Sequence, residues 1–197
     1  MSEDECELPD APRPDHEALE LQRARRTIEL YEPRDDHQAQ ERERILAFID
    51  EHPDALERSC QAGHLTASAL VLDHANQRAL LTHHRKLERW LQLGGHVDGD
   101  GDLAAAALRE ATEESGIDDL ELDPRPIDLD IHTIPARGDE PEHLHLDARF
   151  IARAPEGAVE SVTEESIELG WFAPTEIDAI AVDESVARLF RLAFDGS

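Results

Sequence analysis

Three glutamates stand close together near the C-terminal end of the segment Leu93–Ile117. Glu110, Glu113 and Glu114 follow an alanine-rich run at positions i, i+3 and i+4, and residues at these spacings are neighbours on the surface of a helix. Like charges at these spacings destabilise a helix by roughly 0.2–0.5 kcal/mol per pair. The pattern therefore predicts a partner that compensates the negative charge.

A divalent cation is one such partner. Mg²⁺ prefers carboxylate oxygens and keeps further positions for water and substrate phosphates, so it could clamp a diphosphate and acidify an attacking water. Arg109 lies four residues before Glu113 and could orient that carboxylate. The alternative is a solvated helix face, because a chain with 46 acidic residues produces such triplets by chance.

The residues around the triplet resemble the signature of the Nudix hydrolases. That signature reads Gly, five residues, Glu, seven residues, and then Arg-Glu-apolar-x-Glu-Glu-x-Gly-apolar. Gly95 stands at the first position, and Arg109–Ile117 matches every fixed position of the second part. One position departs, because Gly101 stands where the family has its first glutamate, between Asp100 and Asp102. One of these aspartates could substitute, or the role is lost.

The resemblance implies an α/β fold, a Nudix-type α/β/α sandwich with a mixed β-sheet. It also implies metal-dependent hydrolysis of the pyrophosphate bond in a nucleoside diphosphate derivative or related organic diphosphate, by attack of water on phosphorus. Glu113 and Glu114 would then be the main ligands of Mg²⁺, or of Mn²⁺ in its place. Glu110 would be a further ligand or hold water, and Arg109 would hold the helix carboxylates in place.

Further site residues are expected outside this helix. Gly94 and Gly95 would let the backbone approach the phosphates or the metal, and His96 could contact phosphate or simply pack the loop. A general base is often supplied in the family from a loop before the last strand, where this chain has Glu165. In so acidic a chain that loop could also have no role.

Two segments carry polar side chains at every second position, which places these side chains on one face of a strand. The segments are Asp128–His132 and His143–Asp147. This face could line the substrate cleft, with His143 or His145 touching substrate, or its His and Asp side chains could bind a metal. It could equally be solvated.

Hydrophobic periodicity predicts the elements that position these residues. Helices are expected at 16–31, 38–49, 103–115, 174–177 and 184–194, a hairpin at 64–85, and strands at 90–93, 126–134, 143–152 and 168–172. The strand at 90–93 is expected to end at Gly94-Gly95, and Asp102 and Gly116 are expected to cap the helix between them. Residues 1–15 are interpreted as an acidic disordered tail, 16–58 as an N-terminal helical extension and 59–197 as the Nudix domain.

Charge is the strongest feature of the composition. Asp and Glu number 46 against 19 Lys and Arg, for a formal net charge of -27, and Lys86 is the only lysine. Such a surface repels a nucleic-acid backbone, so no nucleic-acid partner is expected. It suits a salt-rich, halophilic cytoplasm where screening reduces self-repulsion, or it reflects an acidic protein from an organism that prefers arginine.

Other features favour a cytoplasmic protein with a small-molecule diphosphate as its partner. The start of the chain has no apolar signal region, and no apolar run reaches the length of a membrane span. Cys6 and Cys60 lie too far apart to indicate a disulfide framework or a metal cluster. The helices of residues 16–58 could form a homodimer, cap the sheet or complete the substrate pocket.

Two other functions stay open. The first is a ligand sensor or interaction module of the same fold without catalysis, which Gly101 favours and the intact Arg109–Glu114 segment opposes. The second is that of the isopentenyl diphosphate isomerase relatives, which use a cysteine and a glutamate. Cys60 is the candidate for that cysteine, but its context does not resemble theirs, and a lone cysteine is usually a small buried hydrophobe.

Overall fold

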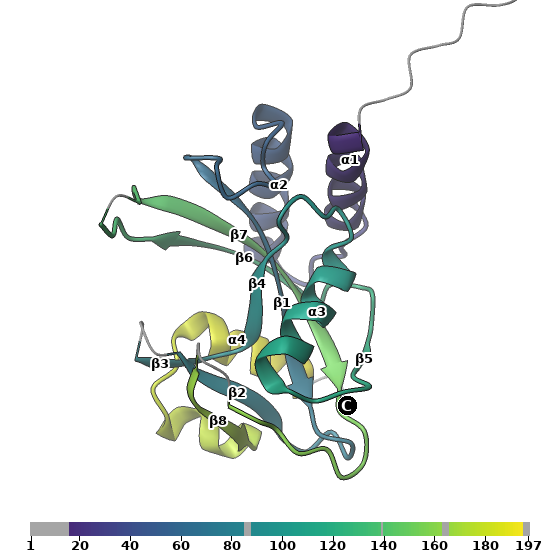
Figure 1. Ribbon diagram of the computed structural model, residues 1–197, viewed down its shortest axis with the longest axis vertical. Helices are drawn as coiled ribbons and strands as arrows, with labels where there is room; N and C mark the ends of the chain where they lie inside the picture. Colours follow the sequence, from purple (N-terminus) through teal and green to yellow (C-terminus); the bar gives the residue numbers. More distant parts are fainter. Residues whose placement is uncertain (1–15, 85–87, 139, 163–165, 195–197) are drawn as a thin grey trace, which may run out of the picture.

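The computed structural model describes residues 16–84, 88–138, 140–162 and 166–194 (Figure 1). A mixed eight-stranded sheet carries helices on both of its faces. The predicted tail, 1–15, lies outside the described residues. In chain order the elements are α1 (His16–Glu29), α2 (Asp36–Glu51), β1 (Gly63–Leu72), β2 (Ala79–His84), β3 (Arg89–Leu91), β4 (Leu93–His96), α3 (Leu103–Ser115), β5 (Glu121–Leu122), β6 (Asp128–Ile134), β7 (His143–Arg153), β8 (Ser166–Phe172), the 3₁₀ helix η1 (Pro174–Ala179) and α4 (Glu184–Phe194).

Strand β1 is the centre of the sheet, and all ten of its residues are buried. It pairs with β7 in parallel along its whole length, from Gly63 opposite Leu144 to Leu72 opposite Arg153. On its other side it pairs antiparallel, first with β4 and then, at its C-terminal end, with β2. The predicted α/β class with a mixed sheet is confirmed, and β1 and β2 form the predicted hairpin.

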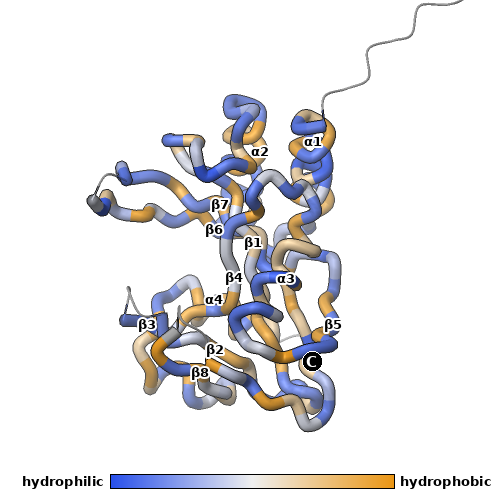
Figure 2. The backbone as a smooth tube through the Cα atoms, viewed as in Figure 1, coloured by the Kyte–Doolittle hydropathy of each residue, from blue (hydrophilic) through white to orange (hydrophobic). Residues whose placement is uncertain are grey.

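Alternation along the strands builds two hydrophobic cores, one on each face of the sheet. Leu65, Ala67 and Ala69 point into a large core shared with α1, α2 and α3, whereas Leu70 and Leu72 join a smaller core with α4 and η1. Figure 2 shows apolar segments on β2, β8 and α4 at the lower left and on the first half of α3. The two cores fix α3 and α4 on opposite faces of the sheet.

The N-terminal helices α1 and α2 lie side by side above the sheet (Figure 1). Ala24 and Ile28 of α1 and Ile45 and Ile49 of α2 are buried in the large core. Burying each isoleucine contributes about 1.5–3 kcal/mol relative to exposure. The two helices therefore help to form the core that holds α3. The division of the chain at residue 59 stays a prediction.

The structure corrects the prediction at 90–93. That segment forms parts of two strands, β3 and β4, and β4 continues through both glycines to His96. Gly94 allows this continuation, because a Cβ atom there would lie 2.3 Å from the Cβ of Ser68 on β1. The glycines thus let two strands approach closely, where the sequence suggested that they end one.

Two further elements differ from the prediction. Strand β6 begins at Asp128, two residues later than expected, and the two-residue strand β5 was not predicted. A strand as short as β5 shows no periodicity in the sequence; it exists because it pairs with the end of β7. None of the described helices is long and apolar enough to cross a membrane.

Candidate active site

Helix α3 carries the predicted carboxylates, and both of its predicted caps are present. The Asp102 side chain accepts the N–H of Ala105 at 3.0 Å, and Gly116 ends the helix in the left-handed conformation at φ 65°. Figure 2 shows the apolar first half of α3 giving way to a hydrophilic second half. The buried side of the helix, which packs on β1 and β4, consists of Leu103, Ala106, Ala107, Ala111 and Ser115.

Glu110 is half-buried between Arg109 and the glycines of β4. Arg109 donates to its carboxylate at 2.5 Å, and a second guanidinium nitrogen donates to the carbonyl of His96 at 3.1 Å. Burial raises the pKa of Glu110, nearby Glu113 adds to that effect, and Arg109 opposes it. Arg109 was expected to orient Glu113, but the structure places it on Glu110, its neighbour in sequence.

The other two glutamates differ in exposure. Glu114 accepts the backbone N–H of Gly94 at 3.0 Å, whereas Glu113 is exposed. A Cβ atom at Gly95 would lie 2.4 Å from the Glu110 carboxylate, so the glycine leaves room for that carboxylate at the end of β4. The three helix glutamates and the two predicted glycines thus lie together.

The chemistry of these residues fits a hard divalent cation. The donors are carboxylate oxygens, the ligands such ions prefer, and burial together with the charge of Glu113 raises the pKa of Glu110. Within the described ranges, the two groups of at least three candidate ligands that converge within 4.8 Å are His64, His96 and His145, and His52, Asp54 and Cys60. The glutamates do not form one of these converging groups.

Helix α1 fills the space beside Gly101, the position that departs from the signature. Gly101 is buried, and its N–H donates to the Glu20 side chain at 2.9 Å. A Cβ atom at Gly101 would lie 2.0 Å from the backbone oxygen of Glu20, so no glutamate fits there while α1 is docked. The neighbouring Asp102 pairs with Arg23 of α1 at 2.5 Å.

Both aspartates that could replace the missing glutamate have structural partners. Asp100 accepts the backbone N–H of Asp102 at 2.8 Å, and Asp102 caps α3. Their interactions hold the loop and the start of the helix.

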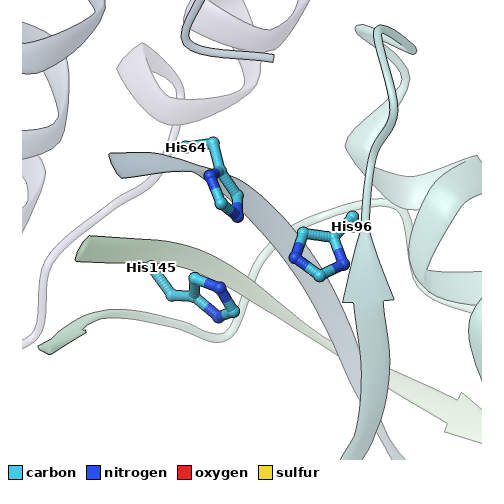
Figure 3. A group of neighbouring side chains, drawn as sticks. All are labelled: His64, His96 and His145. Atoms are coloured by element: carbon cyan, nitrogen blue, oxygen red, sulfur yellow. The ribbon is translucent and has the colours of Figure 1, made fainter. Parts of the chain in front are cut away.

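A polar face of the sheet, which the alternation in β6 and β7 predicted, lies on the side opposite the core that packs against α3. The parallel register sets His64 of β1 beside His145 of β7, and His132 of β6 lies opposite His145. His96 of β4 pairs with Thr66, two residues after His64. We call His64, His96 and His145 the histidine cluster; Figure 3 shows their rings gathered from three strands.

Beyond the cluster, the same face holds a buried network of ion pairs. Arg149 is buried and contacts Asp128, Asp130 and Asp147 at 3.4, 2.9 and 3.0 Å. Arg188 of α4 contacts Asp128 and Asp130, each at 2.8 Å. Burial alone would raise the pKa of Asp130, but a hydrogen bond from His132 and the charges of the two arginines lower it overall.

This network changes the predicted roles of the polar strand residues. The Asp147 carboxylate accepts from Thr66 and Ser68 and pairs with Arg149, so it does not join His143 and His145 as a candidate metal ligand. His143 is buried, with a ring nitrogen 2.9 Å from the carbonyl of Pro141. The polar face is therefore largely paired within the protein, and the histidine cluster is its less satisfied part.

One predicted site residue is not described by the structure, and one residue of the histidine cluster was not predicted. Glu165, the candidate general base, lies outside the described residues. His64 was not singled out from the sequence, although the polar alternation His64, Thr66, Ser68 within an apolar run could have indicated a polar strand face.

The family is shown by a match to the model described as NUDIX domain, which covers residues 63–192. Because this match spans well over half of the chain, the protein belongs to the NUDIX family. The matched range includes the sheet, α3 and most of α4. No curated protein matches the chain.

The fold of this protein resembles those of solved structures of the family. A NUDIX-family hydrolase from Clostridium perfringens is 23% identical over 67% of this chain and 96% of its own, with a TM-score of 0.52. For the Ap4A hydrolase of C. elegans the corresponding values are 20%, 67%, 95% and 0.54. For the dihydroneopterin triphosphate pyrophosphohydrolase of E. coli they are 16%, 68%, 96% and 0.53. At these identities the likeness concerns the fold.

Proposed function

We propose that this protein is a metal-dependent hydrolase that cleaves the pyrophosphate bond of a nucleoside diphosphate derivative or a related organic diphosphate. The observation that carries the proposal is the joining of α3 to the end of β4. Glu114 binds the N–H of Gly94, and Glu110 occupies the space beside Gly95. Carboxylates and an approachable backbone thus meet at one place.

In this proposal Glu110, Glu113 and Glu114 hold Mg²⁺, with Mn²⁺ able to replace it. When bound, the ion supplies neutralisation of diphosphate charge and acidity to a water molecule. Arg109 fixes Glu110 and the carbonyl of His96, which joins the helix to β4. Gly94 and Gly95 leave the backbone open to the phosphates, and Glu165 acts as the general base.

In this proposal the part of the substrate beyond the diphosphate lies against the polar face of the sheet that carries His96, His143 and His145. His96 and His145 are half-buried there, and His143 is buried beside them. Burial lowers the pKa of His96 to about 4 and that of His145 to about 2. Neutral rings offer hydrogen bonds and metal coordination in place of positive charge, so in this proposal the α3 site neutralises the phosphates.

Two of the similar structures support the reaction class. One is an Ap4A hydrolase and the other a dihydroneopterin triphosphate pyrophosphohydrolase. The acidic surface supports a small-molecule partner in a salt-rich cytoplasm, with no nucleic acid or membrane as partner. A homodimer formed through α1 and α2 remains part of the prediction.

The test is release of phosphate-bearing products from a panel of nucleoside diphosphate sugars, dinucleotides, nucleoside triphosphates and diphosphoinositols, in high salt with Mg²⁺ or Mn²⁺. We expect turnover of one class that requires the ion and falls by about 10²–10³-fold in Glu114→Gln. Glu156→Gln, a change of the same kind at an exposed loop position, should retain turnover. Metal-independent turnover, or full activity in Glu114→Gln, would overturn the proposal.

A ligand sensor is the second candidate, and the packing of α1 on Gly101 is the observation that favours it. The family's first glutamate is absent, and Glu20 and Arg23 of a helix outside the matched range contact the loop in its place. A sensor would bind a member of the same panel with unchanged affinity in Glu114→Gln and release no product from it.

A further inference from the structure

The histidine cluster brings three imidazole rings from three strands into contact. The ring centroid of His64 lies 4.9 Å from that of His96 and 4.8 Å from that of His145, and the centroids of His96 and His145 are 5.2 Å apart. One ring nitrogen from each residue lies within 4.8 Å of the other two. Figure 3 shows the rings directed toward one another from β1, β4 and β7.

His64 is buried without the hydrogen bonds that its ring needs. It is 2% exposed, and neither ring nitrogen makes a hydrogen bond of normal geometry to another described residue. Burial lowers the pKa of His64, an effect larger than the opposing one from the backbone of Cys60. A buried polar atom without a partner is unfavourable. A ligand that hydrogen-bonds to a ring nitrogen of His64, or a metal ion that this nitrogen coordinates, would relieve that cost.

The chemistry of the three side chains favours the metal ion. An imidazole nitrogen that carries no hydrogen has a lone pair that can coordinate a metal ion. One nitrogen from each of the three rings converges within 4.8 Å, an arrangement that suits a single cation.

We propose that His64, His96 and His145 form a second metal site, which binds a divalent transition-metal ion of the Zn²⁺ class. Imidazole nitrogen suits Zn²⁺, Ni²⁺, Cu²⁺ and Co²⁺, whereas Mg²⁺ takes oxygen ligands. Three histidines with a fourth position left for water or substrate are one known arrangement of protein-bound zinc. The site uses side chains on the sheet face opposite α3 and shares no ligand with the α3 carboxylates.

The other convergent group, His52, Asp54 and Cys60, has a weaker case. Burial and a hydrogen bond with Asp54 raise the pKa of the Cys60 thiol, and the thiolate is the form that binds metal. Asp54 and Cys60 also already have each other as partners. This group serves as an internal control for the proposed site.

The proposal does not depend on the hydrolase assignment, because its readout is metal binding. The full-length protein is freed of metal by chelation and then titrated with Zn²⁺ in a calorimeter, in excess Mg²⁺ to occupy the carboxylates. We expect one equivalent of Zn²⁺ to bind. His96→Gln and His145→Gln should each weaken that binding by at least about 100-fold, because losing even an indirect support of a metal ligand costs about 10–100-fold.

Three variants are matched controls. His74→Gln changes an exposed histidine in the β1–β2 turn, Cys60→Ala removes a ligand of the other group, and Glu113→Gln removes a carboxylate of α3. Each should bind Zn²⁺ with wild-type affinity. Circular dichroism confirms that every variant is folded before its affinity is compared.

X-ray absorption of the Zn²⁺-loaded wild-type protein gives a readout that needs no variant. We expect nitrogen neighbours at about 2.0–2.1 Å with the scattering pattern of imidazole and no sulfur at about 2.3 Å. A folded wild-type protein that binds no Zn²⁺, binding that survives both histidine changes, or a sulfur neighbour lost in Cys60→Ala would overturn the proposal.

Discussion

The two candidate sites meet at strand β4 and are built in different ways. The carboxylate site depends on one helix, whose glutamates are separated by a single turn and joined to Gly94 and Gly95. The histidine cluster depends on three strands that lie far apart in the sequence, and its rings meet only when β1 pairs with both β4 and β7. A local site is set by residue spacing, whereas a site across strands is set by register.

The two sites also differ in charge. The carboxylates are negative, and the pKa of Glu110 is raised mainly by burial, which favours a hard cation bound through oxygen. The histidine cluster offers imidazole nitrogens in place of negative oxygens, which favours a softer ion bound through nitrogen. The two proposals thus assign the two sites to different kinds of ion.

The largest effect is expected where the polar face is anchored. Arg149→Met should lower the free energy of unfolding by about 3–5 kcal/mol, because Asp147 loses its arginine and Asp128 and Asp130 keep only Arg188. Arg125→Met breaks an exposed pair with Asp123 and should cost about 0–1 kcal/mol. Urea unfolding of both variants measures the difference. Equal costs would show that the ion pairs do not hold the strands of the cluster together.

The next effect tests the carboxylate site at its departure from the family signature. Gly101→Glu should destabilise the protein by about 1–3 kcal/mol or more, because its side chain overlaps the backbone of Glu20. Ala105→Glu adds the same charge at an exposed position of α3 and should change stability little. Hydrogen exchange should show α1 losing protection in the first variant alone; unchanged protection there would mean that α1 does not exclude a glutamate.

A smaller effect tests whether the space at Gly95 serves activity without serving stability. Gly95→Ala brings a methyl group against the end of the Glu110 side chain, which can shift at little cost to folding. We expect metal-dependent turnover to fall by about 10-fold, equivalent to about 1.4 kcal/mol in the barrier, with little change in urea unfolding. Unaltered turnover would show that Glu110 does not need its present position.

The last effect is graded with pH and concerns protons at the histidine cluster in metal-free protein. The pKa of His145 is lowered from 6.5 to about 2 on folding, so below pH 6.5 the unfolded chain takes up a proton that the folded chain does not. Stability from this ring is therefore complete above pH 6.5 and is lost as the pH falls toward 2, by at most about 1.4 kcal/mol per pH unit.

His145→Gln should make this dependence on pH shallower. Urea unfolding between pH 4.5 and 7 measures it, because His145 contributes to the slope over about two pH units of that range. His74→Gln, at an exposed position, should leave the slope unchanged. An identical slope in all three proteins would mean that His145 carries its proton in the folded state as well.

The sequence predicted the parts of the fold that depend on local patterns. Helix α3 with both caps, the β1–β2 hairpin and α4 follow from periodicity and from capping residues such as Asp102. The short strand β5 and the course of β4 beyond Gly94 could not be predicted, because pairing and close packing against Ser68 decide them.

The same division applies to the site. The signature located Glu110, Glu113 and Glu114 on one helix, but the i, i+4 spacing paired Arg109 with Glu113, whereas its side chain contacts Glu110. Alternation on β7 indicated a polar face, yet Asp147 is paired with Arg149 and the cluster draws on His64 instead. Only the parallel register of β1 and β7 brings His64 to His145.

The separation of the two sites is the central claim, and one variant tests it with two readouts. In Glu113→Gln/Glu114→Gln we expect metal-dependent turnover to collapse while one equivalent of Zn²⁺ still binds with wild-type affinity in excess Mg²⁺. Loss of both properties in a folded protein would show one shared site, and retention of turnover would show that the helix glutamates do not carry the reaction.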